Sequence, residues 1–213
     1  MKTREQAQKE IEESALLAME QIGSEEAPTP EQEKAFMTLY GRGHFWLLVG
    51  PRGSGKTTFA AGVLSSISKW YYPKGLAVGM TNILLKRKIR LPDGRETFEE
   101  YYPEGTMKVT SLSDVFHGIL ALSEKKRFET IVLIVDEALQ SEGFASGQTV
   151  LSSDVRAVRS FASILRKVRI CVVLLAQSWK MIQSSYRNED FITGVLIRKW
   201  DGQLAAGYSR YET

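Results

Sequence analysis

The chain has 213 residues, of which 43% are hydrophobic and 25% are charged, so it is long enough for one well-buried core and has the composition of a globular protein. The formal net charge of +3 is too small to indicate a nucleic-acid-binding protein, so any DNA contact has to come from local clusters. The single cysteine, Cys171, lies in an apolar run, which excludes an internal disulfide and predicts a buried thiol.

No apolar run approaches the roughly 18 to 20 residues that cross a bilayer. Residues 1–14, MKTREQAQKEIEES, lack the apolar centre of a secretory signal peptide. We therefore expect a protein that is not an integral membrane protein and that works in the cytoplasm.

Residues 1–22 predict a charged amphipathic helix, because apolar residues recur at helical spacing: Ile11, Ala15, Met19 and Ile22. The helix is expected to end at Gly23, and the following SEEAPTPEQ has the proline and acidic content of a linker. We therefore expect an N-terminal arm over residues 1–30 and a core domain over residues 31–213. The arm has three interpretations: a clasp between subunits, a docking arm for a capsid or membrane partner, or a cover for the core.

Apolar runs after residue 44 predict the strands of the core domain: 45–49, 76–82, 130–138 and 169–178. The last two are apolar almost throughout, which is typical of strands covered on both faces of a parallel sheet. Residues 194–200 and 204–211 predict a closing β-hairpin around Asp201 and Gly202.

Helical patterns separate these strands. The first follows the glycine loop after residue 49 and is expected to bury Phe59, Val63, Ile67 and Trp70; two more cover residues 111–126 and 152–168. Strands that alternate with helices predict an α/β fold with a mostly parallel sheet.

The loop GPRGSGKTT satisfies the pattern G-x-x-x-x-G-K-[ST] between a predicted strand and a predicted helix, which is the context of a phosphate-binding P-loop. Its backbone N–H groups and the helix N-terminus would surround the β-phosphate of ATP. Lys56 would reach the β- and γ-phosphates, and Thr57 would ligate Mg²⁺. The expected nucleotide-binding residues are Gly50, Pro51, Arg52, Gly53, Ser54, Gly55, Lys56, Thr57 and Thr58.

Two acidic residues follow the apolar run IVLIV. Asp136 comes at the carboxyl end of a buried strand, where parallel sheets bind ligands, so its carboxylate is the candidate Walker B group that holds Mg²⁺. Glu137 is the candidate group that orients or deprotonates the attacking water.

Gln177 ends the predicted strand 169–178. A side-chain amide at this position can donate to the γ-phosphate or hold the water. This role requires its strand to lie between the P-loop strand and the Asp136 strand; an ordinary strand-terminal glutamine is the alternative.

The P-loop, the Asp136 and Glu137 pair, and the run RICVVLLAQS after a basic amphipathic helix together resemble the FtsK/HerA superfamily of DNA-pumping ATPases. In that superfamily a sensor glutamine ends the corresponding strand. The tail KMIQSSYRNEDFITGVLIRK resembles the segment that follows this glutamine. The similarity covers about residues 45–200.

The resemblance implies a RecA/ASCE-like P-loop NTPase fold that uses ATP and Mg²⁺ and forms a hexameric ring around double-stranded DNA. In these residues we expect none of the additional domains of the larger members. Its size is close to that of minimal ATPases of viruses and mobile elements, which are implicated in genome packaging or DNA transfer. For a viral protein the expected location is the host cytoplasm or the virion.

Such rings complete each site with an arginine from the neighbouring subunit. Arg156, Arg159 and Arg166 share one face of the predicted helix 152–168, and Arg169 opens the next strand. Arg166 or Arg169 is the candidate finger, and a solvated helix face is the alternative.

Residues 86–95, KRKIRLPDGR, place five basic residues around a Pro-Asp-Gly turn. As a hairpin or projecting loop this segment would follow DNA phosphates without reading bases. The candidate DNA contacts are Lys86, Arg87, Lys88 and Arg90. A solvated basic turn is the alternative.

Two other functions share a P-loop. A small-molecule kinase would transfer phosphate to a substrate such as a nucleoside, but the sequence shows no Arg-rich lid. An AAA-like regulator would use its ATP state to control partner binding, but the sequence shows no C-terminal helical lid. The Asp136 and Glu137 pair followed by Gln177 favours hydrolysis.

Overall fold

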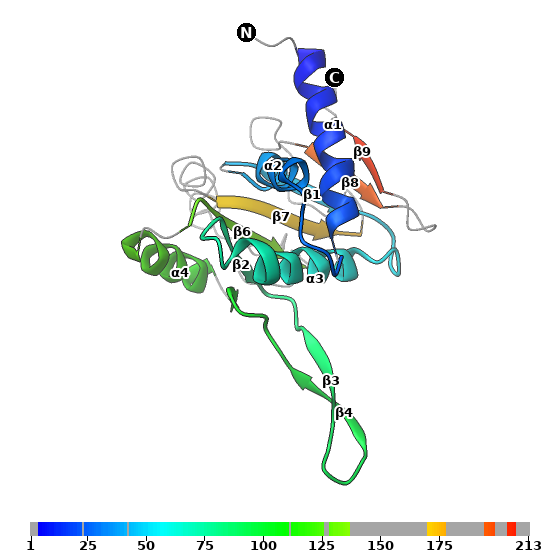
Figure 1. Cartoon of the computed structure of the whole chain (residues 1–213), viewed down its shortest axis with the longest axis vertical. Helices are drawn as coiled ribbons and strands as arrows, with labels where there is room; N and C mark the ends of the chain where they lie inside the picture. Colours follow the sequence, from blue (N-terminus) through cyan, green and yellow to red (C-terminus); the bar gives the residue numbers. More distant parts are fainter. Residues whose placement is uncertain are drawn as a thin grey trace, which may run out of the picture.

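A computed structural model of the chain describes residues 4–22, 24–41, 43–110, 112–125, 128–136, 170–177, 194–198 and 204–207. A seven-stranded sheet in the order β5-β2-β6-β7-β1-β8-β9 lies at its centre, with helices on both faces (Figure 1). The strands are β1 (Phe45–Val49), β2 (Ala77–Thr81), β5 (Thr106–Lys108), β6 (Thr130–Val135), β7 (Ile170–Ala176), β8 (Gly194–Arg198) and β9 (Leu204–Gly207). The predicted α/β class is confirmed.

Neighbouring strands of this sheet are parallel, except that β8 and β9 are antiparallel. The predicted C-terminal hairpin is therefore confirmed as a strand pair, while its turn at residues 201–202 lies outside the described residues. Because β2, β6, β7 and β1 run in the same direction, their carboxyl ends meet along one edge of the sheet. The polar residues that follow these strands are thus brought to that edge.

Alternate residues of the strands enter two separate buried clusters, one on each face of the sheet. On the first face, Trp46, Ile134 and Val173 pack with residues of the helices α1 (Arg4–Gln21), α2 (Pro30–Leu39) and α3 (Lys56–Ser66). On the second face, Leu47, Leu133 and Val172 pack with residues of α4 (Leu112–Lys125). Burial on both faces explains why β6 and β7 are apolar throughout.

The helix after the glycine loop differs from the prediction at one position. Phe59, Val63 and Ile67 are buried as expected, but α3 continues into a π-helical turn, η1 (Ile67–Tyr71). A π-turn adds residues per turn, so Tyr71 takes the buried position, fully enclosed and stacked on Phe36 at a centroid distance of 3.8 Å. The prediction that Trp70 is the buried residue was wrong, since Trp70 is only partly enclosed.

The N-terminal helix α1 ends at Gln21, two residues before the predicted end. Ala15 and Ala18 are buried in the same cluster as α2 and α3, and Ile22 is partly buried against it. The side chains of Ile11 and Met19 lie outside the described set. The division into an arm and a core domain at residue 30 stays a prediction.

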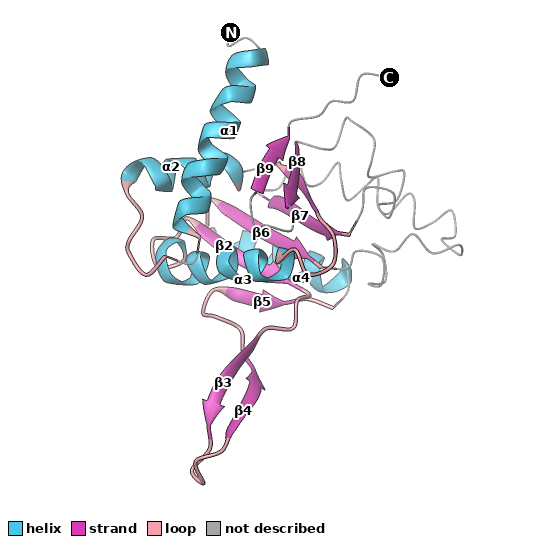
Figure 2. Ribbon diagram, turned by 90° about the vertical axis from the view of Figure 1, so that its right-hand side faces the viewer, coloured by secondary structure: helices cyan, strands magenta, loops and turns pink. Residues whose placement is uncertain are grey.

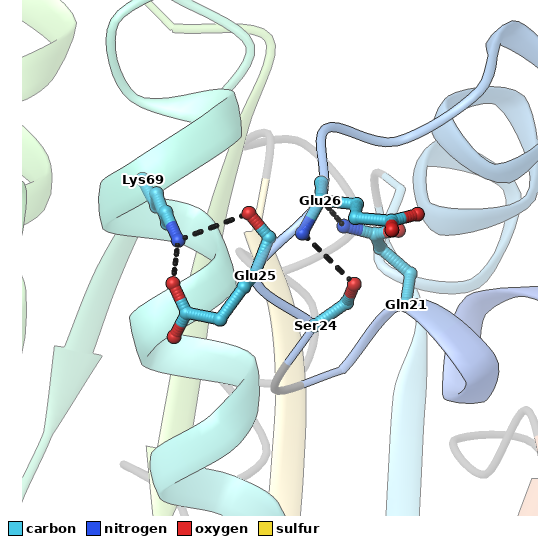
Figure 3. Close-up of polar contacts among 5 residues, drawn as sticks. All are labelled: Gln21, Ser24, Glu25, Glu26 and Lys69. Atoms are coloured by element: carbon cyan, nitrogen blue, oxygen red, sulfur yellow. Dashed lines mark hydrogen bonds and ion pairs between the residues drawn. The ribbon is translucent and has the colours of Figure 1, made fainter.

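The segment between α1 and α2 is fixed by polar contacts (Figure 3). The Gln21 amide donates to the Glu26 carbonyl at 3.0 Å, and the Glu26 N–H donates to the Ser24 hydroxyl at 3.1 Å. Lys69 of η1 donates to both the carbonyl oxygen and the carboxylate of Glu25, at 3.3 and 2.5 Å, and this ion pair lowers the pKa of Glu25. The expected linker is therefore attached to the continuation of the P-loop helix.

A second, two-stranded sheet forms a hairpin that stands away from the body of the molecule, on the opposite side from α1 (Figures 1 and 2). It pairs β3 (Lys86–Arg90) with β4 (Glu96–Glu100) in antiparallel register, with Lys88 opposite Phe98. The basic segment is thus one strand of a projecting hairpin.

Two further elements, the helix before β6 and the buried cysteine, agree with the sequence patterns. The helix expected over residues 111–126 is α4, and Cys171 is completely buried, as predicted. The helix expected over residues 152–168 lies outside the described residues. Within the part of the chain that the structure describes, no helix has the length and apolar character of a membrane span.

Candidate nucleotide-binding site

The loop between β1 and α3 has the geometry of a P-loop. Gly53 and Gly55 adopt φ angles of 79° and 80°, a left-handed conformation that side chains disfavour. The two glycines therefore allow a tight loop over residues 50–55 that leads directly into the N-terminus of α3. Because the first amides of a helix have no partner within it, the loop presents N–H donors where an anion can bind.

Lys56 lies in the first turn of α3 and is 8% exposed. Its Nζ donates to the carbonyl oxygens of Gly50 and Pro51, at 2.7 and 3.0 Å, so the ammonium group closes the loop from within. Burial lowers the pKa of Lys56, and the Asp136 carboxylate opposes this shift. The cation is therefore held inside the phosphate loop, where a triphosphate can replace the two carbonyls as its partner.

Ser54 supplies an independent indication that the loop fits a phosphate. Its side chain is 4% exposed, and its hydroxyl has no hydrogen-bond partner among the described residues. A buried hydroxyl without a partner costs free energy, so such groups require an explanation. A phosphate oxygen in the loop would accept this hydrogen bond.

Thr57 and Asp136 meet although 79 positions separate them in the sequence. The Thr57 hydroxyl donates to Oδ2 of Asp136 at 2.7 Å. Thr57 is the second residue of α3, beside the loop, and Asp136 follows β6 at the carboxyl edge of the sheet. Hydroxyl and carboxylate oxygens are the hard ligands that Mg²⁺ prefers, so the two candidate magnesium residues form one oxygen cluster.

No cluster of three or more His, Cys, Asp or Glu side chains suited to a metal ion occurs in the described ranges. A magnesium ion at Thr57 and Asp136 would thus need further oxygen ligands from the nucleotide and water. This is the usual way in which Mg²⁺ binds in phosphoryl-transfer sites, because it retains much of its water shell.

Asn82 is a residue of this site that the sequence reasoning missed. Its Nδ2 donates to the Asp136 carbonyl at 2.9 Å, and its Oδ1 accepts from the Asp136 N–H at 2.8 Å. Asn82 directly follows β2, the neighbour of β6. The signal that places it here is the one used for Asp136 and Gln177, namely a polar residue at the carboxyl end of a parallel strand.

Gln177 follows β7, and β7 lies between β6 and β1. The strand that Gln177 follows therefore lies between the P-loop strand and the Asp136 strand, which is the strand order that its proposed role requires. The Gly50 N–H donates to the carbonyl oxygen of Ala176 at 3.1 Å, so the backbone next to Gln177 contacts the start of the P-loop. Gln177 is exposed at this edge, and its contact with a γ-phosphate stays a prediction.

Several predicted site residues lie outside the described ranges. These are Glu137, the candidate for water activation, and the candidate fingers Arg166 and Arg169. Within the P-loop, Arg52, Thr57 and Thr58 are exposed, which leaves them accessible to a ligand.

The four candidate DNA contacts on β3 differ in their partners. Arg87 pairs with Glu99 at 2.5 Å, and Lys88 pairs with Glu96. Within the described part of the chain, Lys86 and Arg90 form no ion pair. Arg90 instead points its Nε toward the Gly94 carbonyl at 3.4 Å. Acidic residues of β4 therefore form ion pairs with two of the four cations, while Lys86 interacts with Glu100, the residue opposite it, only at longer range. Lys86 and Arg90 are the two that no described ion pair engages.

Comparisons with known proteins give the following result. No protein-family model and no curated protein matches the chain. Among solved structures, the chain is similar to the Aeropyrum pernix ORC2 protein in its ADPNP and ADP complexes, with 15% identity, a TM-score of 0.49, and coverage of 88% of this chain and 47% of that one. It is also similar to Rhizobiales Trip13, with 13% identity, a TM-score of 0.43, and coverage of 90% and 60%.

A third similar structure is a KaiC-like protein from Pyrococcus horikoshii OT3, with 15% identity, a TM-score of 0.49, and coverage of 83% of this chain and 85% of that one. The chain thus spans 47% and 60% of the lengths of the first two proteins. The loop, the strand order and the contacts described above are what make this a candidate nucleotide site.

Proposed function

We propose that the chain is a Mg²⁺-dependent ATPase that moves double-stranded DNA, as a ring of identical subunits. The contact between Thr57 and Asp136 carries the ATPase part of the proposal, because it joins the P-loop helix to the acid that follows β6, two strands away from β1, at 2.7 Å. The resemblance to the FtsK/HerA superfamily supports the DNA part, with a hexamer as the expected ring.

The described residues have distinct roles in this reaction. Lys56 would transfer its hydrogen bonds from the Gly50 and Pro51 carbonyls to phosphate oxygens. Ser54 would donate its unpartnered hydroxyl to the same phosphates. When bound, Mg²⁺ would neutralise charge on the triphosphate. Thr57 would present its oxygen lone pairs to the ion while its O–H donates to the Asp136 carboxylate, whose negative charge makes the hydroxyl oxygen a better ligand.

Two further groups would act on the γ-phosphate side. The position of β7 between β6 and β1 supports Gln177 as the residue that donates to the γ-phosphate or holds the water. Glu137 would accept the proton of the attacking water, and Arg166 or Arg169 would reach the site of a neighbouring subunit. These assignments follow from the sequence and the resemblance.

The projecting hairpin supports contact with DNA. It stands away from the sheet (Figure 2) and carries Lys86 and Arg90, for which the described residues provide no ion-pair contact of the kind that Arg87 and Lys88 make. Duplex DNA offers a regular row of phosphates, which cations on an extended strand can follow without reading the bases.

The test is the rate of ATP hydrolysis as a function of protein concentration, with and without duplex DNA. We expect weak hydrolysis by dilute protein and a rate per subunit that rises with assembly and with DNA. The variant Glu137→Gln should bind ATP but turn it over far more slowly. A rate per subunit that is unchanged by protein concentration and by DNA would contradict the DNA motor, and ADP release that needs a small-molecule acceptor would indicate a kinase.

A further inference from the structure

We propose that Asn82 is a positioning residue for the magnesium site: its side-chain amide fixes the backbone of Asp136 so that the carboxylate meets Thr57. The inference rests on the proposed function, because it assumes that Asp136 serves Mg²⁺ and ATP. Two reciprocal hydrogen bonds of 2.9 and 2.8 Å between Asn82 and the Asp136 peptide groups carry it.

The reason for this contact lies in the sheet. β2 and β6 pair from Ala77 and Thr130 up to Thr81 and Ile134. After Thr81 the chain leaves the sheet to form the projecting hairpin, so on the β2 side no strand continues beside Asp136, while β7 still runs along its other side. A side-chain amide carries the same donor and acceptor as a peptide group. The Asn82 side chain therefore substitutes for the missing strand at the point where the ladder would otherwise end.

Asn82 is itself held in place from both directions along the chain. The Ile83 N–H donates to the Thr81 hydroxyl at 3.0 Å, and Thr81 is completely buried. The Tyr102 hydroxyl donates to the Ile83 carbonyl at 3.1 Å, from the other leg of the hairpin. A side chain on such a fixed backbone can orient the residue that it contacts.

Asp136 is thereby held at two points. Asn82 binds its peptide groups, and the Thr57 hydroxyl binds its carboxylate at 2.7 Å. If the backbone turned after Val135, the carboxylate would leave Thr57 and the two oxygens would no longer face one ion. Groups that orient a metal ligand typically affect metal affinity by about 10- to 100-fold. Loss of the Asn82 amide should therefore weaken the use of Mg²⁺ more than the binding of the nucleotide.

The substitutions Asn82→Leu and Asn82→Asp test this inference. Leucine is close in shape and makes neither hydrogen bond. Aspartate keeps the acceptor for the Asp136 N–H but places an anionic oxygen against the Asp136 carbonyl. The matched control is Thr130→Val. Thr130 begins β6, at the end of that strand opposite to Asp136, and the substitution removes a buried hydrogen bond of 2.8 Å from its hydroxyl to the Tyr40 carbonyl.

Two measurements on the full chain distinguish positioning from general loss of stability. The first is the Mg²⁺ concentration for half-maximal ATP hydrolysis, which we expect to rise about ten-fold in both Asn82 variants and to stay unchanged in Thr130→Val. The second is amide hydrogen exchange of Asp136 in the protein without nucleotide. We expect its protection to fall in Asn82→Leu, while the amides of Val172 and Leu174 on β7 keep theirs.

The outcomes are separable. Unchanged Mg²⁺ dependence and unchanged Asp136 protection in Asn82→Leu, in a wild-type protein that hydrolyses ATP, would overturn the role of Asn82 alone. Equal changes of the Mg²⁺ dependence and of the Asp136 protection in Asn82→Leu and Thr130→Val would also overturn it, since such changes would reflect a general loss of stability. A wild-type protein that neither binds nor hydrolyses ATP would instead remove the proposed function, and the exchange measurement would still decide whether Asn82 fixes Asp136.

Discussion

The Thr57 hydroxyl donates a hydrogen bond of 2.7 Å to the Asp136 carboxylate, across 79 positions of the chain. The contact joins the start of α3 to the end of β6. A hydrogen bond to an anion leaves the lone pairs of the hydroxyl oxygen free to face a cation. The two oxygens therefore lie side by side, and a cation that binds both would require little rearrangement of either side chain.

The first prediction concerns this hydroxyl. Thr57→Val keeps the shape of the side chain but loses the oxygen, so we expect the Mg²⁺ requirement for ATP hydrolysis to rise about ten-fold or more. Thr57→Ser keeps the oxygen and should remain within a few-fold of wild type. Thr57 is exposed, so both variants should fold. Steady-state rates across a MgCl₂ titration measure the effect, and a valine variant indistinguishable from wild type would exclude Thr57 from the metal site.

The second prediction separates paired from unpaired cations on the hairpin. If Lys86 and Arg90 contact DNA phosphates, the slope of log K against log salt should become shallower by about 0.9 for each of them replaced by alanine. The control is the double variant Lys88→Ala and Glu96→Ala, which removes an ion pair and leaves the net charge unchanged. Its slope should match wild type. If the chain binds DNA and the slope stays the same when Lys86 and Arg90 are replaced by alanine, then other residues contact the DNA phosphates.

The third prediction contrasts two tyrosines. The Tyr71 hydroxyl is fully buried and has no partner within the described structure. Because an unsatisfied buried hydroxyl is costly, Tyr71→Phe should raise the free energy of unfolding by about 1 kcal/mol. The Tyr102 hydroxyl donates to the Ile83 carbonyl, so Tyr102→Phe should lower it by about 0.5 to 1.5 kcal/mol. Urea unfolding measures both, and a destabilised Tyr71→Phe would show that its hydroxyl has a partner.

The fourth prediction concerns the single cysteine. Cys171 is completely buried in β7, and burial raises the pKa of its thiol above the ordinary 9.0. The native thiol should therefore resist iodoacetamide at pH 8 and react fully in urea, as mass spectrometry would record. Since only the unfolded thiol ionises near pH 9, the free energy of unfolding should fall as pH rises above that value. Rapid alkylation of the native protein would contradict the burial.

Sequence patterns were sufficient for the elements that build the site. Long apolar runs predicted β6 and β7, and the glycine-lysine loop predicted the break between β1 and α3, because these signals are local. Strand order is not local. From the sequence we could say which strand order the role of Gln177 requires, but only the folded sheet shows that β7 lies between β6 and β1.

Other features could not be read from periodicity. Tyr71 replaces Trp70 in the core because η1 departs from the α-helical repeat that the spacing assumed. The strand β4, ETFEE, is too acidic and too exposed to give an apolar signal, and its pairing with β3 is what determines which hairpin cations are neutralised. Asn82 acquires its partner only where β2 leaves the sheet beside Asp136.

The central claim is that Lys56, Thr57 and Asp136 form one site for a nucleotide and its metal ion. Its most direct test is equilibrium binding of ATP to the wild-type chain and to Asp136→Asn, with MgCl₂ and with EDTA. We expect wild type to bind ATP about ten-fold or more tightly with Mg²⁺ than with EDTA, and the difference to shrink strongly in Asp136→Asn. If wild type fails to bind ATP, or binds it equally with and without Mg²⁺, then Lys56, Thr57 and Asp136 do not form a nucleotide and metal site.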